Sequence, residues 1–348
     1  MQTKNLMSIK NLVRENILRL TSYSSARSEF KGRASIFLDA NENPFDTGYN
    51  RYPDPLQWKV KEKIAELKGV APERIFLGNG SDEAIDLLIR IFCEPKEDHI
   101  VILPPTYGMY RVSADIADVK VREVQLGARF QPDVQAVLNA ANEHSKLLFL
   151  CSPNNPTGNC FPLDTIGQLA EGFPGITVVD EAYTDFSAQS SSLSLLDQHP
   201  RLVVMQTFSK AWGLAGIRLG MAFASEEIIG LFNKVKPPYN VNQLTQEAVL
   251  KALNNPKQQQ QWVQNILGQR TLLAQYLSGL DFVERIHPSD ANFLLVKVKE
   301  PRRIYDFLVE RSIIVRDRSR VALCEGCLRI TVGTPEENEQ LFRALVEL

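Results

Sequence analysis

The sequence predicts an α/β protein with two domains, a large one built on a mostly parallel sheet and a smaller α+β domain. Two observations carry this prediction. Strand-like apolar runs alternate with helical patterns over residues 75–224, and such alternation is typical of a parallel sheet that helices cover on both faces. The chain of 348 residues, 44% hydrophobic and 23% charged, is also long enough for two domains and a substantial core.

The large domain is expected over residues 33–238, after an N-terminal arm, residues 1–32, that contains a short amphipathic segment. Helices are expected over residues 83–92, where apolar residues form a broad face, and after Thr106 and Pro132. The apolar runs predict strands at residues 75–77, 100–103, 119–124, 147–150, 176–179, 202–205 and 219–224.

The small domain, residues 239–348, is expected to begin after Pro237 and Pro238, because these prolines end the preceding helix. Helices are predicted at about residues 241–254 and 257–278. Two more should follow Pro301 and Pro335, since proline is common in the first helical turn. Strands are predicted around residues 293–298, 313–316 and 328–332.

Composition narrows the class of function. A formal net charge of −2 gives no basic surface for nucleic acid. No apolar run approaches the roughly 20 residues that a membrane-spanning helix needs, and the N-terminus lacks the basic-then-apolar pattern of a signal peptide. We therefore expect a cytoplasmic protein that binds neither nucleic acid nor membrane.

Cys324 and Cys327 have the C-x-x-C spacing of redox and zinc sites. A zinc site would need a second cysteine or histidine pair nearby, and none follows in the sequence, so no metal site is predicted. We favour a structural interpretation in which residues 321–332 form a hairpin that carries Arg329, with a redox or zinc role as the alternative. The five cysteines of the chain, an odd number, do not suggest a secreted disulfide framework.

Three of the predicted strands lead into groups that can do chemistry, namely Asn155, then Asp180 with Tyr183, and finally Lys210. Ligands of parallel sheets bind beyond the carboxyl ends of the strands, so these four side chains should meet there. Each motif alone could be an ordinary turn, a helix cap or a solvated loop. Their order and spacing together predict a site for pyridoxal phosphate.

Pyridoxal phosphate needs an amine that binds its aldehyde covalently and a carboxylate that keeps its pyridine nitrogen protonated. Lys210 is the candidate amine and Asp180 the candidate partner of the pyridinium. Tyr183 and Asn155 are expected to donate hydrogen bonds to the phenolic oxygen of the ring. Lys210 is also expected to act as the catalytic acid and base at the substrate Cα.

The cofactor phosphate is expected to bind Ser209, Arg218 and the N-terminus of a helix. Arginine binds phosphate through charge-assisted hydrogen bonds. A strand, a glycine turn and a helix follow one another around residue 80, which leaves the backbone N–H groups of Ser81, Asp82 and Glu83 free to bind an anion.

Over nearly its whole length the chain resembles the fold-type I pyridoxal phosphate enzymes, in particular the class I/II aminotransferases. The motifs are most similar to those of the histidinol-phosphate aminotransferases. Beyond the asparagine and lysine motifs, the resemblance is carried by residues 39–44, 51–54, 104–110 and 327–333. It implies a large domain with a seven-stranded, mixed but mostly parallel sheet flanked by helices, and a homodimer. In that dimer Tyr52 would reach the cofactor phosphate of the neighbouring subunit, and Tyr107 would lie against the cofactor ring.

The resemblance also implies substrate-binding roles. Arg329 would bind the anionic end of the substrate and Arg316 its phosphate, with Tyr23 closing over the bound molecule. Asn43, within the motif at residues 39–44, is expected to bind substrate as well. The alternative for Arg316 is a surface ion pair with Asp317 or Glu325.

The implied reaction interconverts histidinol phosphate plus 2-oxoglutarate and imidazole acetol phosphate plus glutamate, in histidine biosynthesis. A decarboxylase of a phosphorylated amino acid such as threonine phosphate is an alternative on the same scaffold. An aminotransferase for aspartate or aromatic amino acids is another, because Arg329 can bind a carboxylate as readily as a phosphate. A regulator that binds the cofactor without catalysis usually carries a DNA-binding domain, and the chain has no spare length for one.

Overall fold

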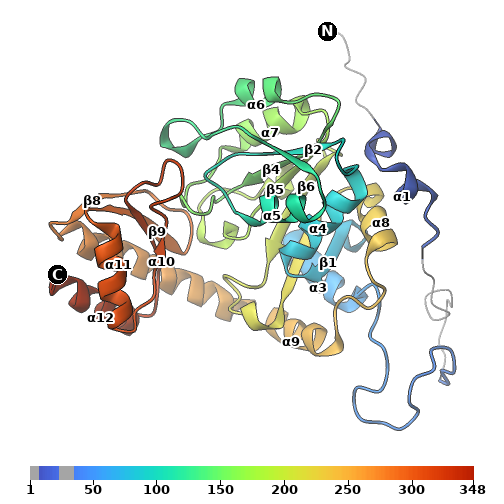
Figure 1. The fold of residues 1–348 in the computed structure, drawn as a ribbon. Coiled ribbons are helices and arrows are strands. Elements are labelled where there is room, and N and C mark those ends of the chain that lie inside the picture. The colour runs from blue at the N-terminus through green and yellow to red at the C-terminus, as the bar shows by residue number, and fades with distance from the viewer. Residues whose placement is uncertain (1–7, 23–34) are drawn as a thin grey trace.

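A seven-stranded mixed sheet forms the centre of the molecule (Figure 1). The computed structural model describes residues 8–22 and 35–348. Strand β7 is antiparallel to both β1 and β6, and the remaining pairings, from β6 to β3, are parallel, so the predicted sheet is confirmed. In spatial order the strands are β1 (Ile75–Asn79), β7 (Leu219–Phe223), β6 (Leu202–Thr207), β5 (Ile176–Asp180), β4 (Ser145–Cys151), β2 (His99–Ile102) and β3 (Lys120–Glu123).

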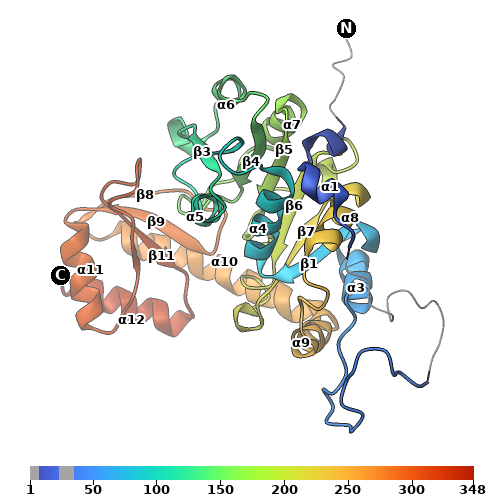
Figure 2. The same cartoon turned by 45° about the vertical axis from the view of Figure 1, so that its right-hand side comes forward.

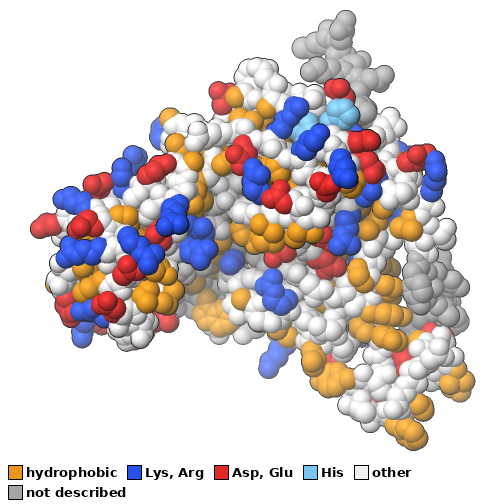
Figure 3. Space-filling view, in the orientation of Figure 1, with side chains coloured by type: hydrophobic (Ala, Val, Ile, Leu, Met, Phe, Trp, Pro, Cys, Tyr) orange, Lys and Arg blue, Asp and Glu red, His pale blue; other side chains and the backbone are white. Residues whose placement is uncertain are grey.

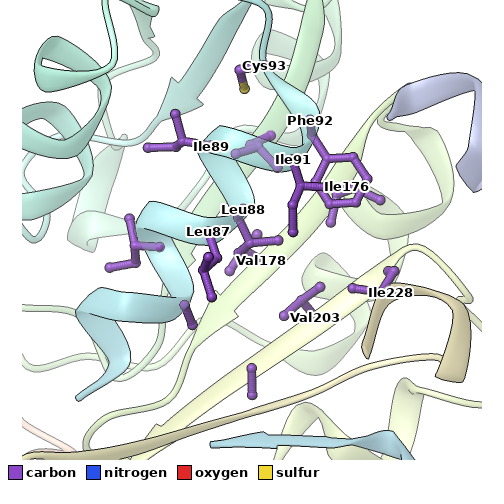
Figure 4. Close-up of a cluster of buried hydrophobic side chains, with 14 of the residues drawn as sticks. Leu87, Leu88, Ile89, Ile91, Phe92, Cys93, Ile176, Val178, Val203 and Ile228 are labelled. Carbon is purple, nitrogen blue, oxygen red and sulfur yellow. The ribbon is translucent and has the colours of Figure 1, made fainter. Parts of the chain in front are cut away.

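Helices cover both faces of this sheet because the side chains of its strands alternate between two apolar clusters. Val178 of β5 faces one cluster and its neighbour Val179 the other. In Figure 4, residues of α4 such as Leu88 and Ile91 lie over Val178. One face is covered by η1 (Ile9–Leu12), α1 (Glu15–Arg19), α4 (Ser81–Phe92), α5 (Met109–Ile116) and α8 (Glu226–Val235). The other face is covered by α3 (Trp58–Lys68), α6 (Val134–Ala140), α7 (Leu163–Gly172) and α9 (Gln243–Leu253).

A second, four-stranded sheet is antiparallel throughout, and the long helix α10 runs from the first sheet to this one (Figure 2). Helices α10, α11 and α12 bury one of its faces in a separate apolar cluster. The elements are, in spatial order, β10 (Arg316–Asp317), β11 (Cys327–Thr331), β9 (Phe293–Val298) and β8 (Val283–Ile286), with α10 (Pro256–Ser278), α11 (Pro301–Glu310) and α12 (Pro335–Val346). Short 3₁₀ helices connect the larger elements, at η2 (Pro72–Arg74), η3 (Ala128–Phe130), η4 (Thr184–Phe186), η5 (Ser192–Leu195) and η6 (Ala215–Ile217).

Two local predictions were wrong. The strand expected over residues 313–316 begins only at Arg316, as the two-residue strand β10. Residue 313 is not extended because the N–H of Ile313 still bonds to the Leu308 carbonyl where α11 ends. The hairpin expected over residues 321–332 therefore starts earlier, at β10, and a loop separates its two strands.

The predicted domain limits stay a prediction. Helix α9, which follows the expected junction at residue 238, packs Val249 and Leu253 into the same cluster as Val60 and Ile64 of α3. Within the part of the chain that the structure describes, no helix is both long and apolar enough to cross a membrane.

Candidate active site

The carboxyl ends of β4, β5 and β6 meet at a cavity of about 740 Å³ that β10 and β11 border from the other side. Asn155, Asp180, Tyr183 and Lys210 all line it, as their positions after neighbouring strands predict. The predicted residues that also line the cavity are Ser81, Asp82, Tyr107, Ser209, Arg218, Arg316 and Arg329.

Asp180 ends β5 and is only 3% exposed. Its Oδ2 accepts a 2.8 Å hydrogen bond from the hydroxyl of Tyr110, and its Oδ1 accepts one of 3.1 Å from the N–H of Ala182. Burial raises the pKa of the carboxyl to about 6, against the opposing effect of these two donors. Tyr110 was not predicted as a site residue; it is fully buried and stacks on Phe149 with 4.6 Å between ring centroids.

Lys210 follows β6, and its Nζ lies 5.5 Å from the centre of the Tyr183 ring. Desolvation lowers the pKa of its amine, the cation of Arg329 lowers it further, and Asp180 opposes both. A lowered pKa increases the fraction of uncharged amine, which is the form that attacks a carbonyl. Within the described ranges no hydrogen bond or ion pair engages this Nζ.

A cradle for an anion lies where η6 meets the N-terminus of α4. Arg218 adopts a left-handed conformation with φ of 54°, and its Nη1 lies 3.4 Å from Ser209 Oγ. Gly80, the N-cap of α4, has φ of +75°, and a Cβ there would come within 2.6 Å of Arg218 Nη2. The backbone N–H groups of Ser81 and Asp82 are the first two of α4 and lack partners within the helix. Donors of this kind fit a phosphate group.

Two predicted phosphate-site residues differ from the expectation in detail. The Asp82 carboxylate lies 3.8 Å from Arg218 Nη2 and accepts a 3.2 Å hydrogen bond from the hydroxyl of Tyr107. Glu83 is not among the residues that line the cavity. Its carboxylate instead accepts hydrogen bonds from the side chains of Asn79 and Asn240.

Arg316 and Arg329 are cross-strand partners in the β10–β11 pair. Nη1 of Arg329 donates a 2.5 Å hydrogen bond to Oδ1 of Asn155, whereas its buried Nε has no acceptor in the described structure. The alternative of a surface ion pair between Arg316 and Asp317 or Glu325 was wrong. Asp317 accepts hydrogen bonds from Ser319, and among residues 8–22 and 35–348 no arginine pairs with Asp317 or Glu325.

Two further predicted residues, Asn43 and Tyr52, do not line this cavity within one chain. Asn43 and Tyr52 line a different cavity of about 620 Å³, where Tyr52 stacks on Tyr239 with 4.4 Å between ring centroids. The side chain of Asn43 accepts a hydrogen bond from the backbone of Phe45. Tyr23 lies outside the described residues.

Cys324 and Cys327 are buried against Leu295 of β9. Burial raises the pKa of their thiols to about 12 and about 11, which keeps both protonated near neutral pH. This packing supports their structural interpretation. Among residues 8–22 and 35–348, no cluster of three or more histidine, cysteine or acidic side chains could hold a metal ion.

The chain is similar to known proteins over most of its length. Residues 37–345 match the family described as aminotransferase class I and II. A histidinol-phosphate aminotransferase from Parabacteroides distasonis is 55% identical over 340 residues, which cover 98% of this chain and 99% of that protein.

Solved structures of several enzymes share the fold. Histidinol-phosphate aminotransferase from Sinorhizobium meliloti, in complex with pyridoxal-5'-phosphate, gives a TM-score of 0.79 at 23% identity, over 85% of this chain and 82% of the other. L-threonine-O-3-phosphate decarboxylase from Porphyromonas gingivalis gives 0.71 at 23% identity, over 85% and 93%. Because both reaction types use this fold, the fold alone does not identify the reaction. The family match over most of the chain, together with the lysine, aspartate and phosphate cradle of the cavity, shows that the chain is a pyridoxal phosphate enzyme of the aminotransferase class I and II family.

Proposed function

We propose that the enzyme interconverts histidinol phosphate plus 2-oxoglutarate and imidazole acetol phosphate plus glutamate, a step of histidine biosynthesis. The observation that carries this proposal is the pair Arg316 and Arg329, which face the same cavity as Lys210 from adjacent strands. No carboxylate of the described residues forms an ion pair with either arginine, so their charge is available to an anionic substrate. The name of the Parabacteroides distasonis relative supports the same reaction.

Lys210 is the residue that would hold pyridoxal phosphate, with Asp180 at its ring nitrogen and Ser81, Ser209 and Arg218 at its phosphate. When bound, the cofactor supplies a protonated ring that stabilises negative charge at the substrate Cα. Lys210 Nζ would take the Cα proton as a general base, a role that its lowered pKa favours. Tyr107 and Tyr183 also line the cavity in which this reaction would occur.

Asp180 would remain ionised opposite the pyridinium because two donors hold its charge. The hydroxyl of Tyr110 and the N–H of Ala182 each bind one carboxylate oxygen. Hydrogen bonds to the charged form oppose the burial that raises the pKa of Asp180 to about 6. An adjacent cation would lower this pKa further, so the carboxylate is the functional form near neutral pH.

We also propose a homodimer in which Tyr52 acts on the neighbouring subunit, and a cytoplasmic location. The segment before α3 projects from the body of the chain, and Figure 3 shows hydrophobic side chains on it. Ile36, Leu38 and Phe45 are 75%, 89% and 78% exposed. Apolar side chains exposed together in this way are typical of a protein interface. Tyr52 is 50% exposed and lines a cavity other than the one that holds Lys210, which supports a role for it on the neighbouring subunit.

A titration of the cofactor-loaded enzyme tests the reaction. Each candidate amino donor is added alone, and the visible absorbance of the bound cofactor is followed. Histidinol phosphate should abolish this absorbance at low concentration, whereas aspartate, phenylalanine and threonine phosphate should require far more. Release of carbon dioxide from threonine phosphate, or a clear preference for aspartate over histidinol phosphate, would contradict the proposed reaction.

A further inference from the structure

Arg318 is a third arginine on the face of the small sheet that borders the cavity. The register of β10 and β11 pairs Arg316 with Arg329, and the N–H of Arg318 continues it with a 2.9 Å hydrogen bond to the Cys327 carbonyl. Side chains two residues apart on an extended strand point to the same face, so Arg318 shares the face of Arg316 and Arg329. All three line the cavity that holds Lys210.

The guanidinium of Arg318 is partly buried without a complete set of partners. Its Nε is inaccessible to solvent and has no acceptor among the described residues, as is also the case for Nε of Arg329. A buried donor without an acceptor is costly, and the cost is recovered when a ligand supplies the acceptor. Burial and the cations of Arg329 and Arg316 lower the pKa of Arg318. None of the described carboxylates forms an ion pair with Arg318 to relieve this repulsion.

We propose that Arg318 completes a three-arginine subsite that selects a substrate with a terminal phosphate over one with a carboxylate. A phosphate monoester places up to two negative charges and three acceptor oxygens at one end of the molecule, whereas a carboxylate offers one charge and two oxygens. Three guanidinium groups on one face of the sheet match the phosphate, which has more negative charge and more acceptor oxygens than the carboxylate. This inference rests on the proposed function, because it assigns Arg318 to the phosphate of histidinol phosphate.

The test compares Arg318→Gln with the matched control Arg320→Gln, two residues further along the same loop. Arg320 is exposed and lines a different hollow with Asp317. In single-turnover measurements, Arg318→Gln should raise the half-saturating concentration of histidinol phosphate by about 10- to 100-fold, as expected for a lost charge-assisted hydrogen bond. The values for glutamate and for histidinol, which lacks the phosphate, should change by less than about threefold on the same reasoning. Arg320→Gln should match the wild type with all three.

A binding measurement separates this role from catalysis. Calorimetric titration of the cofactor-loaded enzyme uses two probes without an amino group, phenethyl phosphate and 3-phenylpropanoate. The wild type should bind the phosphate more tightly than the carboxylate, and Arg318→Gln should lose that preference. Arg318→Lys keeps the positive charge but not the planar set of guanidinium donors, so it should keep part of the preference.

Three results would overturn the role of Arg318. These are unchanged binding of the phosphate in Arg318→Gln, an equal loss for both probes, or a loss confined to glutamate and the carboxylate probe. Failure of the proposed function would give a different pair of results in the reaction and binding measurements. The wild type would then leave histidinol phosphate unreacted, while phenethyl phosphate would still bind in a manner that depends on Arg318.

Discussion

The hydroxyl of Tyr110 donates a 2.8 Å hydrogen bond to Oδ2 of Asp180, in a region where both side chains are almost completely buried. The two residues are 70 positions apart in the sequence, and the stacking of Tyr110 on Phe149 fixes the ring that carries the donor. Tyr110 therefore positions the carboxylate and stabilises its charge without needing to touch the substrate.

Tyr110→Phe should shift the pH dependence of the enzyme. Loss of the donor leaves Oδ2 of Asp180 without its partner, so the pKa of the carboxyl should rise. A hydrogen bond to a charged group contributes roughly 1.5–3 kcal/mol, which corresponds to about one to two pH units. The acidic limb of the kcat/KM profile should move upward by that amount, while the plateau at high pH changes little. A uniform fall at every pH would instead indicate disturbed packing.

Asp180→Asn should separate function from stability. Without the negative charge the pyridinium proton is no longer held, and turnover should fall on the order of 100-fold or more. The buried carboxyl has its pKa raised from 3.8 to about 6, so the folded state binds the proton more tightly than the unfolded state. Wild-type stability is therefore lost as pH rises from about 4 to about 6, by roughly 2–3 kcal/mol for this one group.

Cofactor-free Asp180→Asn should lack this loss of stability. Its free energy of unfolding should exceed that of the wild type above pH 6, and the difference should vanish toward pH 4. Urea denaturation of both proteins at several pH values measures it. Wild-type turnover in the variant, or a stability difference that grows as the pH falls, would refute the assignment of a buried, ionised Asp180.

Reduction with borohydride should attach the cofactor to Lys210 and to no other lysine. Lys236 is the informative competitor, because burial also lowers the pKa of its amine, to about 8. Its Nζ, however, already donates to the Pro55 carbonyl at 2.7 Å and to Oδ1 of Asn240 at 3.0 Å. Peptide mapping by mass spectrometry identifies the modified lysine, with Lys210→Ala as the control that should carry no label. An adduct on Lys236 would show that the site has been misplaced.

The sequence was sufficient to predict the centre of the site because its groups follow directly from neighbouring strands. Every residue of β5 and β6 is buried, so both strands appear as largely apolar runs. Asp180 and Lys210 come within three residues of their ends. Parallel strands end at the same edge of a sheet, which brings these side chains together whatever the details of packing.

Other features depend on contacts that the sequence does not reveal. Tyr110 lies on the buried side of α5 and is indistinguishable in the sequence from an ordinary core aromatic. In the sequence, Arg318 is indistinguishable from the other charged residues of a polar loop. Only the register of β10 with β11 assigns it to the sheet face that borders the cavity. Strand β8 was missed because its central residues, Glu284 and Arg285, are exposed and interrupt any apolar run.

Hybrid dimers should show whether Tyr52 acts on the other subunit. A Tyr52→Phe chain is paired with a Lys210→Ala chain, using different affinity tags to purify the hybrid. If Tyr52 serves the partner, one site of the hybrid has both native residues and the other has both changes. Activity per Lys210 should then equal that of the wild type. If Tyr52 instead acts within its own chain, the activity per Lys210 should equal that of the Tyr52→Phe homodimer.

Arg316→Gln should reveal whether the substrate carries a phosphate. Arg316 faces Arg329 across the β10–β11 pair and has no carboxylate partner in the described structure. Loss of a charge-assisted contact in a partly desolvated cavity should cost roughly 1.5–3 kcal/mol, so KM for histidinol phosphate should rise about 10- to 100-fold. KM for histidinol, which lacks the phosphate, should stay nearly unchanged, because Arg316 has nothing to bind at that end of the molecule. Equal losses for the two compounds would mean that Arg316 supports the fold or the cofactor, and the argument for a phosphorylated substrate would then depend on Arg318 and Arg329.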